Sequence, residues 1–309
     1  MLNLGNFPFG EPVTALSQRD RTPKRVFVHG VYASAVHAKW IDTKSKVVVK
    51  ALAVASEPHI FWTGESEDVV ISRVNIPSAL GILVPADKQF NGPSGLALDN
   101  EILHPLGVLR QEAWLCDLVP YSCLNPKQNN AILEKYVPWV QKGIVQPVRT
   151  MPVPRILTTD KRIDEITQEL MESKAECMIL LGDQPIKWYL SKFTNKWKTL
   201  SDFGEDIDTY GKVHPVTIEG QTINVLPLAH PRQIAKLGTS SQKWYQLHKK
   251  WKQLSKYNSG QKNPTAKDLL ELGLSHGISA IDEGDLECGT KRLLARLPQL
   301  LNNVNDIKQ

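Results

Sequence analysis

The stretch RVFVHGVYASAVHAKW, Arg25–Trp40, decides how the chain can fold. Its apolar run Val26–Val28 has the length and composition of a buried strand. Gly30 interrupts the run, small residues follow at 33–35, and an amphipathic segment comes after them. We predict a strand that passes through glycine into a helix start, which places backbone N–H groups at the carboxyl edge of a parallel sheet. An ordinary strand-to-helix turn that packs small residues has the same pattern.

Three later apolar runs support a parallel sheet whose carboxyl edge binds a ligand, rather than an ordinary strand-to-helix turn. They span 113–119, 177–181 and 223–228, and each leads into a polar or glycine-containing turn. An amphipathic helix is predicted over 159–175, directly before the second run, and another helix begins at Gln184, after it. This order is the βαβ rhythm of a doubly wound sheet. We therefore predict an α/β protein: a three-layer α/β/α sandwich with a short, mostly parallel sheet and a C-terminal helical extension.

The other segments predict smaller elements around this sheet. In chain order we expect a loop-rich lead-in over 1–24, a strand over 46–56, short antiparallel strands or an insertion over 69–84, a helix over 125–136 and a long helix over 240–256. The long helix carries an aromatic and apolar stripe at helical spacing: Trp244, Leu247, Trp251 and Leu254. Its lysines are either solvated or in contact with phosphate. We assign residues 1–255 to one α/β domain, and 256–309 to a linker and a helical extension packed on the core.

Composition sets broad limits on function. A net charge of +5 permits a nucleic-acid partner without requiring one. The first residues carry no charged segment followed by an apolar core, and no apolar run approaches the roughly 18 residues of a membrane span, so we expect a cytoplasmic protein without a membrane partner. The four cysteines, Cys116, Cys123, Cys177 and Cys288, form no CxxC pair, so neither a disulfide framework nor a zinc site is expected. A cluster assembled from these four scattered cysteines is the alternative.

Five short motifs occur along the chain in an order that can be compared with known families. They are Gly30-Val31-Tyr32-Ala33-Ser34, Gly95-Leu96-Ala97-Leu98, Leu115-Cys116-Asp117, Leu180-Leu181-Gly182-Asp183 and His230-Pro231-Arg232-Gln233. Over residues 25–255 their order and spacing resemble the uracil-DNA glycosylase superfamily, as a divergent branch. Members of that family carry a Gly-x-Asp/Asn-Pro motif after the first strand, a Gly-Leu-x-Phe type segment, a strand ending in Asn, a Leu-x-Gly strand and a His-Pro motif.

The resemblance implies a DNA glycosylase that acts as a monomer and without a cofactor or metal. Such an enzyme flips a nucleotide out of the DNA stack and hydrolyses its N-glycosidic bond. His230 would then lie beside the O2 atom of a pyrimidine and stabilise the charge that develops on the leaving base. A loop histidine bonded to backbone is the alternative interpretation of this residue.

The chain departs from the family pattern at each of the other site positions. Tyr32 stands where the family has its water-activating Asp or Asn, and Ala33 replaces the proline after it. Ser34 replaces a bulky tyrosine beside the pyrimidine C5 atom. Asp117 stands where an Asn reads the base, and Leu98 stands at the position of the aromatic stacking residue. A glycosylase with these residues does not read and hydrolyse uracil in the usual way.

Asp117 and Ser34 together favour a modified cytosine. A carboxylate only accepts hydrogen bonds, so it repels uracil O4 but accepts from the cytosine N4 amino group, and a protonated acid also donates to N3. A small residue at position 34 leaves room for a C5 substituent, such as the hydroxymethyl or sugar groups of a phage genome. A turn bond from Asp117 to Ser122 or backbone, and simple packing of Ser34, are the structural alternatives.

The water-activating group has several candidates: Glu57, Asp99, Asp183 and His37. We assign Glu57, together with His230 and Tyr32, to the catalytic set. After the last strand, the family fold contacts phosphates, and we expect that role for Arg232, Lys236, Ser240, Ser241 and Lys243, with Ile234 or Leu237 as a wedge into the vacated stack. The rival functions are a uracil-type repair glycosylase, a catalytically inactive DNA-binding protein on the same fold, and a hydrolase of small nucleosides.

Overall fold

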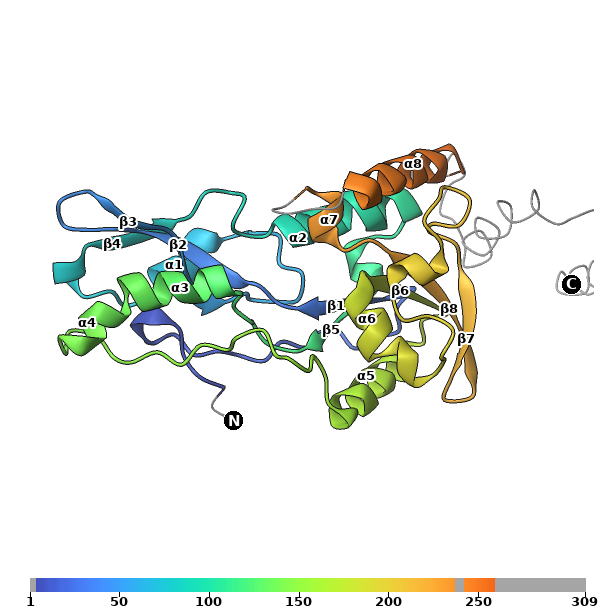
Figure 1. The fold of residues 1–309 in the computed structure, drawn as a ribbon, viewed down its shortest axis with the longest axis horizontal. Coiled ribbons are helices and arrows are strands. Elements are labelled where there is room, and N and C mark those ends of the chain that lie inside the picture. The colour runs from blue at the N-terminus through green and yellow to red at the C-terminus, as the bar shows by residue number, and fades with distance from the viewer. Residues whose placement is uncertain (1–3, 237–241, 259–309) are drawn as a thin grey trace, which may run out of the picture.

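A five-stranded, mostly parallel sheet organises the protein. The computed structural model describes residues 4–236 and 242–258 (Figure 1). The sheet order is β5-β1-β6-β8-β7. Its strands are β1 (Val26–Tyr32), β5 (Ala113–Val119), β6 (Cys177–Leu181), β7 (His214–Ile218) and β8 (Gln221–Leu228). Only β7 is antiparallel, to β8, with which it forms a hairpin at one edge. Helices flank this sheet in the manner of a three-layer α/β/α sandwich, so the predicted fold class is confirmed.

The parallel strands form because their sequences are apolar on both faces. All seven residues of β5 and all five of β6 are buried, and β1 is buried from Val26 to Gly30. Burial on both faces is what covering helices impose on a parallel sheet. In register, Val26 pairs with Ala113 on one side and Cys177 on the other, so the carboxyl ends of the strands line up at one edge.

The helix that we predicted behind β1 is instead a strand. After Tyr32 the chain forms β2 (Ala35–Ile41), which pairs antiparallel with β3 (Val47–Ser56) and β4 (Ile82–Pro85). Alternate residues Val36, Ala38 and Trp40 are buried, and the Trp40 indole Nε1 donates to the Leu80 carbonyl at 2.8 Å. A period of two with branched and aromatic residues favours a strand over a helix.

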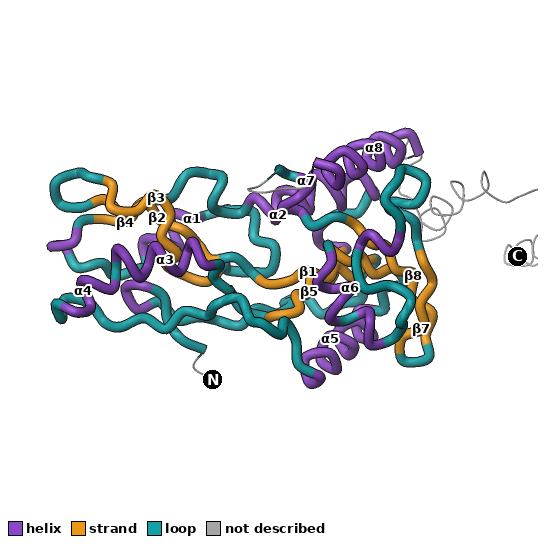
Figure 2. Tube along the Cα trace, viewed as in Figure 1, coloured by secondary structure: helices purple, strands orange, loops and turns teal. Residues whose placement is uncertain are grey.

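This second sheet, in the order β3-β2-β4, has a hydrophobic core of its own. The core contains Trp40, Trp62 and Tyr136 and is covered by α1 (Glu67–Ser72), α3 (Pro126–Lys135) and α4 (Val137–Gln141). Figure 2 shows this group at the opposite end of the molecule from β7. The strand predicted over 46–56 is confirmed. Over 69–84 the prediction holds only for β4, because α1 occupies the first part.

Three predicted helices form where their start signals lie. In α3, Asn125 caps the first turn by accepting from the Gln128 backbone at 3.0 Å, and Pro126 takes the first helical position. Thr159 caps α5 (Asp160–Ser173), and α6 (Asp183–Trp188) follows β6 after Gly182. The other helices are α2 (Pro93–Ala97), α7 (Pro231–Ile234) and α8 (Gln242–Asn258). A π-helical segment, Leu98–Leu103, follows α2 directly. Short 3₁₀ segments lie at Pro8–Gly10, Ser78–Leu80, His104–Leu106, Arg110–Glu112, Leu190–Lys192 and Leu200–Phe203.

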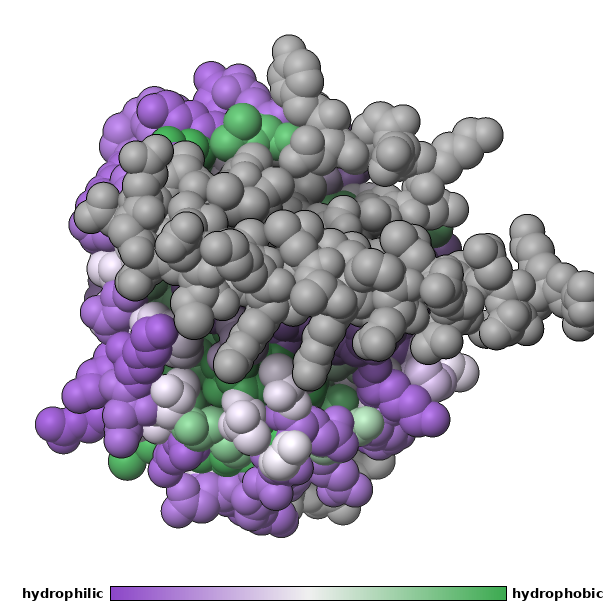
Figure 3. Space-filling view, turned by 90° about the vertical axis from the view of Figure 1, so that its right-hand side faces the viewer, coloured by the Kyte–Doolittle hydropathy of each residue, from purple (hydrophilic) through white to green (hydrophobic). Residues whose placement is uncertain are grey.

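The long predicted helix is α8, and its stripe is only partly buried. Leu247 and Trp251 are buried, whereas Leu254 is exposed. Figure 3 views the end of the molecule where β7 lies, and among the coloured residues hydrophilic side chains surround smaller hydrophobic areas. The predicted linker was placed from residue 256 onwards, but α8 continues to Asn258, so the start of that prediction is wrong. The rest of the predicted linker and the extension, residues 259–309, lie outside the described residues.

Candidate active site

The carboxyl ends of β1, β5, β6 and β8 surround a cavity of about 310 Å³, which we call the base cavity. Six of the residues singled out in the sequence line it: Tyr32, Ser34, Glu57, Asp117, His230 and Arg232. They come from four segments that are far apart in the chain. Convergence of polar groups at the carboxyl edge of a parallel sheet is the usual location of a ligand site in this class of fold.

Gly30 allows this cavity to form. It pairs in register with Asp117 across β1 and β5. A Cβ atom at Gly30 would collide with Oδ1 of Asp117 and would lie 2.7 Å from Cζ of Phe61. Glycine therefore lets a carboxylate and an aromatic ring approach the first strand together.

We expect Gly30→Ala to lower the free energy of unfolding by about 1–3 kcal/mol, because two buried groups must move aside for one methyl group. Urea unfolding of the variant and the wild type measures the difference. Identical midpoints would show that Asp117 and Phe61 yield freely and that glycine is not required there.

Two buried carboxyl groups face the base cavity. Asp117 is 4% exposed and Glu57 is 7% exposed. Burial raises the pKa of Asp117 to about 7, although the charge of Arg162 acts in the opposite direction. Burial, and then the charge of Asp117, raise the pKa of Glu57 to about 8. Both groups therefore titrate near neutral pH, as groups that exchange protons with a substrate do.

The surroundings of Asp117 exclude one structural alternative. The Ser122 hydroxyl donates to the Ser34 carbonyl at 2.6 Å, so the turn bond that could have tied Ser122 to Asp117 is made elsewhere. Arg162 holds the strand end, since its Nη2 donates to the Asp117 backbone carbonyl at 2.8 Å. The backbone of Asp117 is thereby anchored while its side chain lines the cavity.

His230 caps α7, the short helix that follows β8. Its Nδ1 accepts from the Arg232 backbone N–H at 3.2 Å, which leaves the ring proton on Nε2. Burial, and then the charge of Arg232, lower the pKa of His230 to about 4, so the ring is neutral at neutral pH. Gly182, with φ +80°, allows close packing, since a Cβ there would lie 3.1 Å from the His230 Cβ. The predicted Leu-Leu-Gly motif thus positions the histidine, which can donate one hydrogen bond to a developing anion.

Of the four candidates for water activation, Glu57 alone lines the base cavity. Asp99 pairs with Arg110 at 2.6 Å, and Asp183 accepts from the Leu200 backbone at 2.8 Å. The ring Nε2 of His37 lies 2.9 Å from the Gln128 side-chain nitrogen, outside this cavity. Those three residues therefore have structural partners away from the base cavity. Burial raises the pKa of Tyr32, which lines the cavity as a protonated hydroxyl.

The prediction that Leu98 stacks on the base is wrong, because its side chain is 0% exposed and belongs to the core. The aromatic residues that line the cavity are Tyr32, Phe61 and Trp62, and sequence reasoning missed Phe61 and Trp62. Phe61 has φ +52°, and its carbonyl accepts from Arg110, which also pairs with Asp99. The available signal was the aromatic cluster Ile60-Phe61-Trp62 directly after an apolar strand.

A second cavity, of about 500 Å³, adjoins the base cavity, and we call it the side cavity. Ser34, Ser94 and Arg232 line both. The remaining wall of the side cavity is mainly polar: His37, Gln89, Asn125, Lys127, Gln128 and Lys236. Ser34 therefore stands between the base cavity and a neighbouring space that is rich in hydrogen-bonding groups.

The predicted phosphate contacts divide into three groups. Arg232 lines both cavities, and Lys236 lines the side cavity. Lys243 forms an ion pair with Glu205 and lines neither cavity. The wedge role of Ile234 is corrected, because its side chain is 4% exposed. Ser240, Ser241 and Leu237 lie outside the described residues.

No protein-family model and no curated protein matches the chain. Within residues 4–236 and 242–258, no helix has the length and apolar composition needed to cross a membrane. In the same ranges, no three His, Cys, Asp or Glu side chains are grouped in a way that could hold a metal ion. Cys116, Cys123 and Cys177 are free thiols.

The environment of Glu57 gives a stability test that does not depend on function. Its pKa in the folded protein, about 8, lies above its ordinary value of 4.5, so its contribution to stability is complete below pH 4.5 and is lost as the pH rises to 8. We expect Glu57→Gln to remove this loss and to stabilise the protein at pH 8 by on the order of 2 kcal/mol. Thermal unfolding from pH 5 to 8 checks this, and a variant less stable than wild type at pH 8 would contradict it.

Proposed function

We propose that this protein is a DNA glycosylase that excises a cytosine modified at C5, leaving an abasic site. One observation carries the proposal: Asp117, Glu57, His230 and Ser34 line a single cavity, and Ser34 also lines the adjoining side cavity. A base of pyrimidine size suits the first space, and a substituent on that base suits the second.

Asp117 supplies base recognition. As a carboxylate it accepts from the N4 amino group of cytosine, and as an acid it donates to N3. A pKa of about 7 makes both forms available at neutral pH. Uracil presents a carbonyl oxygen where cytosine presents N4, and a buried carboxylate opposite that oxygen costs free energy.

The side cavity favours a large C5 group. Gln89 and Lys127 are the kind of side chains that bind sugar hydroxyls, and the cavity volume of about 500 Å³ exceeds what a hydroxymethyl group needs. This supports a glucosylated hydroxymethylcytosine over the hydroxymethylated base alone. Such bases belong to bacteriophage genomes, so we propose a role in defence against phage DNA.

The chemistry follows from the positions of the other side chains. Phe61 lies at the cavity wall as a surface on which a flipped base can rest, and Ser34 leaves its C5 side open. As the bond between C1′ and N1 breaks, its electron pair moves to the base, and the Nε2–H of His230 donates to the O2 atom. Water adds to C1′ and gives a proton to the Glu57 carboxylate. The departing base takes up a proton from solvent and Glu57 returns its proton to solvent, so the net reaction consumes one water and leaves an abasic sugar.

Oligonucleotides that carry uracil, cytosine, hydroxymethylcytosine or glucosylated hydroxymethylcytosine test the proposal. After incubation with the protein, alkali cleaves the strand at any abasic site. Strand breaks that are fastest with the glucosylated base, and that persist in the presence of a chelator, are the expected result. Fastest breaks at uracil would support a repair glycosylase, DNA binding without breaks an inactive binding protein, and action on free nucleosides alone a nucleoside hydrolase.

A further inference from the structure

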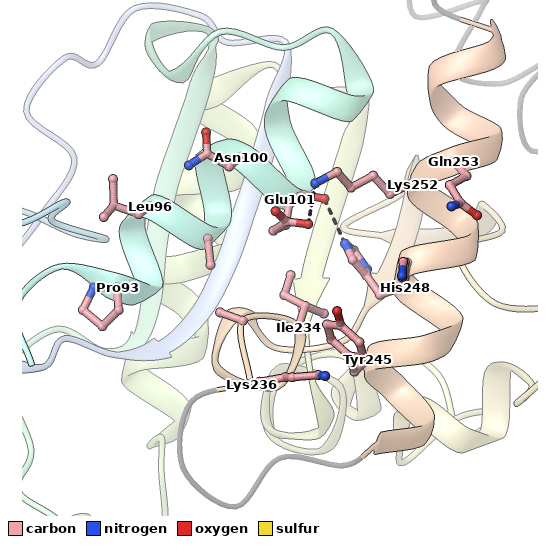
Figure 4. A pocket seen from close by; sticks show the side chains of 13 residues that line it. Pro93, Leu96, Asn100, Glu101, Ile234, Lys236, Tyr245, His248, Lys252 and Gln253 are labelled. Carbon is pink, nitrogen blue, oxygen red and sulfur yellow. Dashed lines mark hydrogen bonds and ion pairs between the residues drawn. The ribbon is translucent and has the colours of Figure 1, made fainter. Parts of the chain in front are cut away.

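A third cavity, of about 650 Å³, lies beside α8, and we call it the α8 cavity. Figure 4 shows its walls. Leu96 and Asn100 lie on one side, and the α8 side chains Tyr245 and His248 lie on the other. Ile234, at the end of α7, lies between them. The lining is mostly apolar with lysines among it, so this cavity differs in chemistry from the side cavity.

Hydrogen bonds fix α8 against the opposite wall. His248 Nε2 donates to the Glu101 carbonyl at 2.8 Å, and Nδ1 accepts from the Tyr210 hydroxyl at 2.8 Å. The same hydroxyl accepts from the Ala229 backbone at 2.9 Å, at the end of β8. Lys252 pairs with Glu101 at 2.6 Å, which neutralises the acidic side chain of the lining. The cavity is therefore held open by its own walls, and the charge left over in its lining is positive.

The other groups that line the α8 cavity suit a nucleotide, because some can bind its phosphate and others can contact its base. Lys236 and Lys249 line the cavity and carry the positive charge that a phosphate requires. The Lys236 ammonium lies 3.9 Å from the centre of the Tyr245 ring, so charge and aromatic surface occur at one place. Leu96, 47% exposed, adds apolar surface for a base. A basic groove with aromatic and apolar surface is typical of sites that hold unpaired nucleotides.

The three cavities adjoin one another, since neighbouring cavities share lining residues. Pro93 and Lys236 line both the α8 cavity and the side cavity, and Ser34 and Arg232 line both the side cavity and the base cavity. We propose that the α8 cavity is a second nucleotide site, which holds an unpaired nucleotide of the strand that carries the target base. Lys236 and Lys249 bind its phosphate, and its base rests on Tyr245 and Leu96. The identity of the ligand as DNA rests on the proposed function.

Binding of single-stranded oligonucleotides with ordinary bases tests this site separately from excision. Fluorescence anisotropy of the full chain compares wild type with Tyr245→Ala, Lys249→Glu and the control Lys250→Glu. Lys250 is exposed on the same helix but does not line the cavity. We expect Tyr245→Ala and Lys249→Glu each to weaken binding about tenfold, and Lys249→Glu to lower the salt slope by about 0.7 more than the control does.

The outcomes separate the two proposals. If Lys249→Glu and Lys250→Glu weaken oligonucleotide binding equally, and Tyr245→Ala does not weaken it, the α8 site is overturned and the glycosylase proposal is left intact. Wild-type protein that binds no DNA at all would overturn both. On substrates with a single-stranded flank on one side of the target, the effect of Tyr245→Ala should appear for one flank only, and an effect on both flanks or neither would also overturn the site.

Discussion

Glu57→Gln is expected to lower the excision rate by about 100- to 10,000-fold, the range that removal of a general base produces. Glutamine has the shape of glutamate but cannot take a proton from the attacking water. Single-turnover excision on the best modified substrate measures the effect. Because Glu57 lines the base cavity and neither the side cavity nor the α8 cavity, we expect the variant to bind the same oligonucleotide as tightly as wild type.

The pH profile provides a second measure of the same role. The pKa of Glu57 is about 8, so the base form is scarce at pH 6 and the rate should rise about tenfold per pH unit until it levels near pH 8. That rise should be absent in Glu57→Gln. Asp160→Asn is the control, because Asp160 pairs with Lys192 and does not line the base cavity. A Glu57→Gln rate within tenfold of wild type would assign water activation to another group.

The sequence allowed prediction of those site residues that directly follow a buried parallel strand. The runs that form β1, β5 and β6 are apolar on both faces, and this composition by itself marks them as buried parallel strands. Residues just after such strands meet at one edge by topology alone. Asp117 and His230 were therefore placed correctly at the cavity, although their chain positions are more than a hundred residues apart.

The rest depends on contacts that no local pattern encodes. Phe61 reaches the cavity because its backbone adopts φ +52° and its carbonyl is held by Arg110, 49 residues away. Leu98 was aligned by motif spacing, but the turn that contains it points the side chain into the core. The segment after Tyr32 has small residues that suit either a helix start or a strand start. Pairing with β3 and β4 decides between them, and those partners come later in the chain.

Asp117→Asn should reverse the preference between cytosine-type and uracil-type bases. We expect a loss of about 10- to 100-fold on the modified cytosine, because a mismatched polar edge in a buried pocket costs about 1–3 kcal/mol. Excision of uracil should rise at the same time, since an amide can donate to O4 and accept from N3–H. The variant also removes the charge that helps raise the pKa of Glu57, so the midpoint of the pH–rate curve should move below 8. Unchanged selection among the four bases would show that Asp117 does not read the base.

Ser34→Tyr should act on the C5 group alone. Ser34 lines both the base cavity and the side cavity, so a tyrosine there would fill the space that a C5 group needs to reach from one to the other. We expect the excision rate of glucosylated hydroxymethylcytosine to fall by at least about 100-fold. The tyrosine ring crowds the base cavity and also keeps the sugar out of the side cavity, and the two effects add together. Unmodified cytosine should be affected far less, and Ser34→Ala, which leaves that space open, should behave like wild type on both. Rates on paired oligonucleotides that differ only at C5 give the comparison directly. If Ser34→Tyr slows both substrates equally, the side cavity does not hold the substituent, and the sugar must leave the base cavity by another route.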